Sequence, residues 1–131
     1  VEFNSLVNRI DNTRDWDAVM IGLSGGVDPH SGKNVWMTTG QLHMWNLGSP
    51  RSRYAWEHEV DDIFDRAAQE LDHGRRKALY DRWQEIVMRE LPMIFTVTPA
   101  VLYAYRDRLG NLKPTVHGGL LHNVEEIYLK K

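Results

Sequence analysis

The chain has 131 residues, 42% of them hydrophobic and 26% charged, with a formal net charge of -2 at pH 7. This length allows one domain at most, and the charge gives no electrostatic case for binding nucleic acid or an anionic membrane. Cysteine is absent, which excludes disulfides, thiolate catalysis and cysteine-based zinc sites, and no apolar run approaches the ~20 residues of a membrane span. The sequence starts at Val1 without a signal peptide, so we expect a fragment of a longer protein.

Residues 1–23 are predicted to form a strand, a short helix and a second strand. Leu6, Val7 and Ile10 have helical spacing, and Asn4 is a suitable N-cap. The nearly unbroken apolar run from Trp16 to Leu23 predicts a strand buried on both faces, as in a parallel sheet covered by helices.

Residues 24–56 are predicted to be one long irregular stretch rich in Gly, Ser, Asn, Thr and Trp. Loops of this length are uncommon inside compact domains and tend to be functional. Its aromatic residues either close an edge of the core or form a wall of a binding site, and both interpretations stay open; these residues are Trp36, Trp45, Tyr54 and Trp56.

Two amphipathic helices follow, predicted as a hairpin with a short connection. The apolar stripe of the first helix consists of Val60, Ile63, Phe64, Ala67, Ala68 and Leu71. His73-Gly74 ends that helix or turns the chain. The face of the second helix consists of Leu79, Trp83, Ile86, Val87 and Leu91, and Pro92 stops it.

The C-terminal third has weaker signals. Residues 93–105 are β-branched and aromatic, which predicts one or two strands interrupted by Pro99. Residues 106–111 are predicted to form a turn, and residues 124–129 a short extended or helical piece.

The stretch LSGGVDPHSG, residues 23–32, invites three interpretations. The spacing of a phosphate-binding loop is absent, because Lys33 is followed by Asn34 rather than Ser or Thr. Asp28 and His30 are a candidate acid/base pair. The structural alternative is that Asp28-Pro29 caps a turn, with the aspartate accepting local amide hydrogen bonds.

Other titratable groups favour structural interpretations. The six histidines show neither HExxH nor a pair at i, i+4, so no metal site is expected. Glu57, Glu59, Asp61 and Asp62 could supply the two carboxylates of a hydrolase, although a solvated helix N-terminus explains them as well. The basic run at residues 75–77 is interpreted as helix surface.

Several motifs occur together in a characteristic order. They are Trp16-Asp17, Asp28-Pro29, Trp45-Asn46, Val60-Asp61, Asp72 with Arg75 or Arg76 and Leu79-Tyr80, residues 84–87, Glu90-Leu91-Pro92 and residues 118–123. The arrangement resembles the C-terminal portion of the family 5 extracellular solute-binding proteins, the peptide- and nickel-binding components of ABC importers.

The resemblance implies an α/β fold: part of the C-terminal lobe of a two-lobed, type II periplasmic-binding-protein-like receptor that closes around its ligand. The amphipathic hairpin would pack on a small mixed sheet. Residues 1–105 would belong to the C-terminal ligand-binding lobe, and residues 106–131 would cross back toward the other lobe.

In peptide-binding relatives, an aspartate four residues before the motif's proline pairs with the α-ammonium of the peptide. That position is Gly25 here, so the resemblance leaves recognition to backbone amides, the Ser24 hydroxyl and aromatic walls. The expected ligand contacts are Ser24, Gly25, Gly26, Asp28, Trp45 and Asn46. Asp17 and Trp83 are assigned to structure.

The expected function is therefore the substrate-binding component of an ABC importer, without catalysis or cofactor. It would bind a peptide or similar small solute in the periplasm or extracellularly and deliver it to permease subunits, with no nucleic-acid partner and with the membrane reached only through the transporter or a lipid anchor. Two alternatives stay open: a hydrolase domain using Asp28 and His30 or the run from Glu57 to Asp62, and a small helical interaction module.

Overall fold

The computed structural model describes residues 1–46 and 54–131. The chain divides into two compact units, Val1–Ile94 and Phe95–Lys131. Part of the predicted irregular stretch, residues 47–53, lies outside the described residues. The assignment of residues 1–105 to a ligand-binding lobe and of residues 106–131 to a crossing tail stays a prediction.

The first unit begins with helix α1 (Phe3–Asn8), which runs on into the π-helical turn η1 (Arg9–Thr13). The helix is capped by Glu2 rather than Asn4: the Glu2 carboxylate accepts hydrogen bonds from the backbone N–H groups of Asn4 and Ser5, both at 2.9 Å. Arg14 ends η1 in the left-handed region, with φ of 54°. The helix was predicted, but the strand expected before it does not form.

The strand predicted at Trp16–Leu23 is also wrong. Residues 14–28 contain no helix or strand, and Met20 is 76% exposed. A strand takes its backbone hydrogen bonds from a neighbouring strand, and among the described residues none pairs with this run. Apolar character alone therefore did not produce a strand.

Short helices occupy the region that was predicted to be irregular. They are the 3-10 turn η2 (Pro29–Gly32), helix α2 (Lys33–Trp36) and the 3-10 turn η3 (Met44–Asn46). Asp28 caps η2 and Pro29 occupies its first position, where proline's missing N–H costs nothing. The structural interpretation of Asp28-Pro29 as a cap is confirmed.

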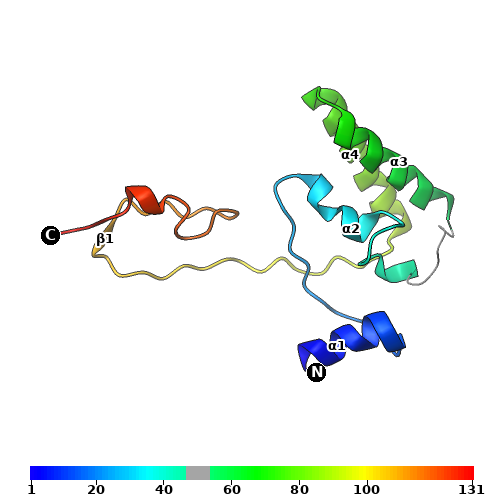
Figure 1. Cartoon of the computed structure of the whole chain (residues 1–131), viewed down its shortest axis with the longest axis horizontal. Coiled ribbons are helices and arrows are strands. Elements are labelled where there is room, and N and C mark those ends of the chain that lie inside the picture. The colour runs from blue at the N-terminus through cyan, green and yellow to red at the C-terminus, as the bar shows by residue number, and fades with distance from the viewer. Residues whose placement is uncertain (47–53) are drawn as a thin grey trace. The chain divides into compact units, whose positions relative to one another are not determined.

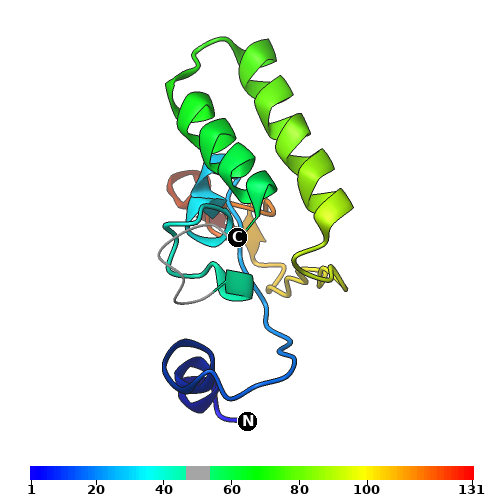
Figure 2. The same ribbon diagram turned by 90° about the vertical axis from the view of Figure 1, so that its right-hand side faces the viewer.

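Helices α3 (Ala55–Gln69) and α4 (His73–Glu90) form the predicted hairpin and lie side by side (Figures 1 and 2). Helix α3 begins five residues before Val60. His73-Gly74 starts α4 rather than ending α3, because the Asp72 side chain accepts a hydrogen bond from the Arg75 backbone N–H at 2.8 Å. Leu71 consequently lies in the connection and is 97% exposed, so its place in the stripe was wrong.

The core of the unit lies where the hairpin meets α2. It consists of Trp36, Val60, Ile63, Phe64, Ala67, Tyr80, Ile86 and Val87, with Leu79 and Trp83 partly buried against them. Rings pack edge to face: the Phe64 centroid lies 5.6 Å from both Tyr80 and Trp83. Ala68 and Leu91 are exposed, so the buried face of each helix contains fewer residues than the predicted apolar stripe.

Within the first unit the hairpin contacts α2 and η2, and its packing on a small mixed sheet stays a prediction. The two strands of the described residues, β1 (Leu109–Gly110) and β2 (Tyr128–Leu129), belong to the second unit and pair antiparallel, Leu109 with Leu129 and Gly110 with Tyr128. A Cβ added at Gly110 would overlap the Tyr128 ring, so a larger residue at this position would displace that exposed side chain.

The rest of the second unit is mostly irregular. The turn predicted after Arg106 is confirmed by a 3.2 Å hydrogen bond from the Leu109 N–H to the Arg106 carbonyl. The predicted piece at 124–129 contains both forms, a 3-10 turn η4 (Val124–Glu126) and then β2. The strands predicted within residues 93–105 are wrong: no strand occurs there, and Val97 and Leu102 are 81% and 89% exposed.

In the described part of the chain, the helices are too short or too polar for any of them to cross a membrane.

Candidate ligand loop and a buried His43–Glu57 cluster

All five residues of the loop 24–28 are exposed to solvent. Ser31 closes the loop, because its hydroxyl accepts a hydrogen bond from the Gly26 N–H at 3.1 Å and donates one to the Asp28 carbonyl at 2.7 Å. The Gly26 amide is thus already used within the loop. Around Gly25 there is open space: a Cβ added there would meet no heavy atom within 4 Å.

The Asp28 carboxylate has two partners. It accepts a hydrogen bond from the His30 backbone N–H at 2.8 Å. Nη2 of Arg76, on α4, lies 2.8 Å from Oδ1 and 2.7 Å from Oδ2. The Arg76 guanidinium is the main cause, and the His30 N–H the second, of a lowered pKa of the Asp28 carboxyl. Asp28 therefore carries a carboxylate whose charge is matched by a cation of the hairpin.

His30 contacts Asp28 through its backbone. Its ring lies against the core, with the centroid 6.0 Å from that of Phe64, and its Nδ1 atom is buried without a hydrogen-bond partner among the described residues. The two residues proposed as an acid/base pair are thus held as a cap and a core contact.

Trp45 and Asn46 lie in a separate environment. The Trp45 Nε1–H donates a hydrogen bond to Glu57 Oε1 at 3.0 Å, and its ring centroid lies 5.7 Å from that of Trp36. Asn46 is 8% exposed. Within residues 1–46 and 54–131, no hydrogen bond connects either residue with residues 24–28. The structure thus brings Ser24, Gly25, Gly26 and Asp28 together, but it places Trp45 and Asn46 with the core.

A buried polar cluster escaped the sequence interpretation. Glu57 is fully buried and His43 is 3% exposed. His43 Nδ1 lies 3.1 Å from the Val35 carbonyl, and a carbonyl only accepts, so Nδ1 carries a proton. Nε2 lies 3.2 Å from Glu57 Oε1. One carboxylate thus joins α3 to the segment that precedes it.

The position of Glu57 explains why a carboxylate is tolerated there. It is the third residue of α3, and its Oε2 accepts a hydrogen bond from the backbone N–H of Tyr54, the N-cap, at 3.3 Å. Negative charge is favoured at a helix N-terminus, and buried polar groups persist where they are hydrogen-bonded. A glutamate three residues after a cap is the sequence signal for this arrangement, but Tyr54 is not among the usual cap residues.

The other carboxylates of the acidic run also have structural partners, which corrects the view of a simply solvated helix start. Glu59 accepts from Arg82 Nε of α4 at 2.7 Å, and Asp61 accepts from the Thr38 N–H at 2.8 Å. Asp62 pairs with Arg66 at 3.0 Å on the same helix. Glu59 thus connects α3 with α4, and Asp61 connects it with the residues after α2.

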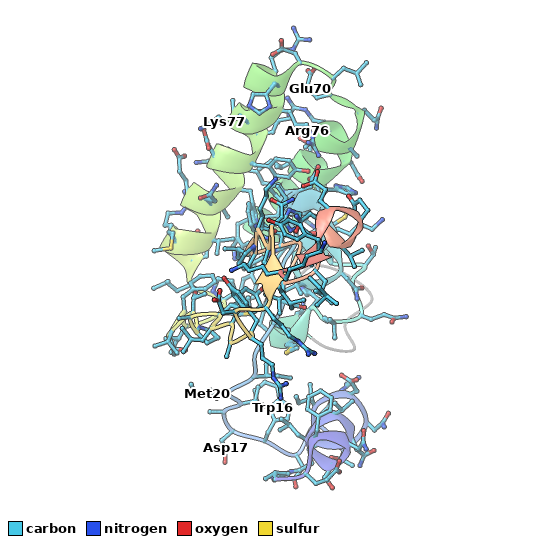
Figure 3. The ribbon with its side chains drawn as sticks, turned by 90° about the vertical axis from the view of Figure 1, so that its left-hand side faces the viewer. Trp16, Asp17, Met20, Glu70, Arg76 and Lys77 are labelled. Carbon is cyan, nitrogen blue, oxygen red and sulfur yellow. The ribbon has the colours of Figure 1, made fainter. Side chains whose placement is uncertain are left out.

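A cavity of about 380 Å³ lies near the N-terminus, outside the predicted contact set. Its walls are Val1, Leu6, Arg9, Ile10, Trp16, Ala18, Val19 and Met20; Figure 3 labels Trp16 and Met20. Across the described ranges, no three His, Asp or Glu side chains are grouped closely enough to hold a metal ion.

Comparison with known proteins finds one informative similarity. The chain is 31% identical over 121 residues to a probable ABC transporter-binding protein of Deinococcus radiodurans, a match that covers 83% of this chain and 20% of that protein. The chain thus spans about a fifth of the length of this curated relative. No family model matches the chain, and no solved structure matches it.

Proposed function

We propose that the chain supplies part of the substrate-binding component of an ABC importer. The observation that carries the proposal is the similarity over 121 residues to a probable ABC transporter-binding protein. The order of the motifs supports the finer assignment to the family 5 solute-binding proteins and to the C-terminal lobe of a type II fold. In this proposal the chain is not an enzyme. Its receptor works in the periplasm or extracellularly and passes a peptide or similar solute to permease subunits.

The proposed ligand surface is centred on residues 24–28. Ser24 and Gly25 are exposed and offer a hydroxyl and a backbone amide, and such placed polar groups give binding sites their specificity. Gly26 and Asp28 shape the same loop. Trp45 and Asn46 remain in the proposed contact set, although their side chains lie with the core and Asn46 is buried.

The test is a thermal-unfolding screen of the protein that carries this chain, against trialanine, N-acetyl-trialanine, glucose and Ni²⁺. A ligand at 100 times its dissociation constant adds about 2.7 kcal/mol to the free energy of unfolding. We expect a clear rise in Tm with one class of solute, and recovery of that solute unchanged. Stabilisation by none of them, or chemical conversion of one, would contradict the proposal.

Replacement of Gly25 by aspartate tests the loop directly. A Cβ added at Gly25 meets no heavy atom within 4 Å, so the backbone there can carry a side chain. We expect Gly25→Asp to bind trialanine more tightly relative to N-acetyl-trialanine, by about threefold to fivefold, the range of an exposed ion pair. Gly22→Asp is the matched control, since its surroundings are equally open and it lies outside the contact set. An equal change in both variants would argue against this loop.

A further inference from the structure

Arg76 holds the candidate ligand loop from 48 residues away in sequence. Its Nη2 atom contacts both carboxylate oxygens of Asp28 at 2.8 and 2.7 Å. The guanidinium is itself fixed: Nε donates a hydrogen bond to the Ala67 carbonyl at 3.0 Å, and the group lies 5.3 Å from the centroid of the Tyr80 ring. Three different interactions thus set the orientation of this cation.

The Ala67 carbonyl explains the fixed position. Ala67 lies in the last turn of α3, where carbonyls have no partner within the helix. Arg76 satisfies one of them and reaches on to Asp28, so the end of α3, the first part of α4 and the loop are joined through one side chain. Figure 3 shows Arg76 near the end of the hairpin where Glu70 lies in the connection.

Asp28 transmits this restraint to the loop backbone. Its carboxylate accepts from the His30 N–H, while its carbonyl accepts from the Ser31 hydroxyl, which in turn accepts from the Gly26 N–H. Because Arg76 holds the Asp28 carboxylate, it restrains the backbone at His30 directly. It also restrains the backbone at Gly26 through Asp28 and the Ser31 hydroxyl.

The contact between Arg76 and Asp28 also determines which charged or polar groups of the loop are available to a ligand. An ammonium group could bind the Asp28 carboxylate only in competition with an arginine already placed at both of its oxygens. The exposed groups that remain, the Ser24 hydroxyl and the Gly25 amide, suit carbonyl, hydroxyl or carboxylate oxygens.

We propose that Arg76 is a positioning residue that orders residues 24–28 and neutralises Asp28, so that this loop receives an uncharged or oxygen-bearing part of the solute and not a free ammonium group. Asp28 then acts through the shape of the loop. This inference rests on the proposed function and names the chemical class of its ligand.

The specificity experiment uses Arg76→Gln, which leaves the Asp28 carboxylate without its cation. Binding of trialanine and N-acetyl-trialanine is measured by calorimetry for the protein that carries this chain. We expect Arg76→Gln to change the ratio of the two dissociation constants about threefold to fivefold in favour of the free amine. Arg75→Gln is the matched control, because Arg75 pairs with Glu70 and not with the loop. Equal ratios in the two variants would overturn the proposal.

Arg76→Lys separates charge from shape. It keeps the cation but loses the planar geometry that reaches two oxygens and a carbonyl, so the ratio should return toward that of the original protein. A ratio as altered as in Arg76→Gln would overturn the neutralising role, since loss of charge would then not be the cause.

A ligand-free measurement keeps the two proposals distinguishable. Amide hydrogen exchange at Gly26, His30 and Ser31, whose N–H groups are hydrogen-bonded within the loop, should accelerate on the order of threefold in Arg76→Gln and not in Arg75→Gln. Unchanged exchange in Arg76→Gln would overturn the positioning role. If the original protein bound neither peptide, the proposed peptide ligand would fail, while the exchange result would still decide the role of Arg76.

Discussion

The helix hairpin and the segments at 14–28 and 95–105 are all rich in apolar residues, yet only the hairpin forms regular structure. In the hairpin, Val60 and Phe64 are fully buried, whereas Val97 and Leu102 are 81% and 89% exposed. A helix makes its backbone hydrogen bonds within itself, but a strand needs a neighbour. Apolar sequence thus becomes buried structure only where its backbone hydrogen bonds are also provided.

The largest expected effect tests the packed side of this comparison. Phe64→Ala should lower the free energy of unfolding by about 4 kcal/mol, because it removes a buried ring and leaves a cavity between α3 and α4. Leu71→Ala, at a 97% exposed position in the connection, should change it by less than about 0.5 kcal/mol. Urea unfolding followed by circular dichroism measures both. Similar losses would show that the hairpin does not carry the stability of the unit.

A second, smaller effect tests whether the buried polar cluster of His43 and Glu57 also contributes to the free energy of unfolding. Glu57→Ala should cost about 3 kcal/mol, because it removes the buried carboxylate that both His43 Nε2 and the Trp45 Nε1–H contact. Glu59→Ala is the matched control on the same helix, with a side chain 42% exposed and paired with Arg82, and should cost less than about 1 kcal/mol. Equal costs in urea unfolding would mean that the buried cluster adds nothing beyond a surface pair.

The smallest effect concerns the connection between the helices. Arg75, and next the Asp72 backbone N–H, lower the pKa of Glu70 from 4.5 to about 2. A lowered folded-state pKa stabilises the fold above the unfolded value of 4.5 and loses this contribution as the pH falls toward about 2. Glu70→Gln should therefore be less stable than the original chain at pH 6, with most of the difference lost near pH 2 and the rest below it. Thermal melting across this range measures it.

The partner variant decides the cause of that pH dependence. In an Arg75→Gln background, replacing Glu70 should produce a smaller pH-dependent difference, since the leading cause of the pKa shift has been removed. A difference of the same size in both backgrounds would assign the shift to the backbone instead.

The helix hairpin could be predicted because its signal is periodic and local. Val60, Ile63 and Phe64 repeat at helical spacing, and a helix needs no distant partner to use that pattern. The ends of the helices were harder to predict. Leu71 fits the spacing of the α3 stripe, but α3 ends at Gln69 and Asp72 caps α4, so Leu71 lies in the connection. The strand predicted at Trp16–Leu23 failed for the opposite reason, because hydrophobicity says nothing about whether a neighbouring strand is present.

The candidate site divides in the same way. The local half of the role of Asp28, a cap on the turn that starts at Pro29, follows from two adjacent residues. Its other half, the contact with Arg76, joins residues far apart in sequence, and the basic run at 75–77 gave no sign of it. Glu57 was noticed in the acidic run and His43 was one of the six histidines, but their pairing depends on where His43 lies against α3.

The sequence by itself determined the hairpin, the cap at Asp28 and a family resemblance in keeping with the similarity to a probable transporter-binding protein. These features depend on the spacing of residues, on adjacent residues and on the order of motifs, all of which can be read directly from the sequence. Only the tertiary structure decided that Glu57 is buried, that Arg76 holds Asp28 and that apolar runs remain without strands. Each of these depends on which distant groups meet, because burial, ion pairing and strand pairing are properties of a residue's surroundings and not of the residue alone.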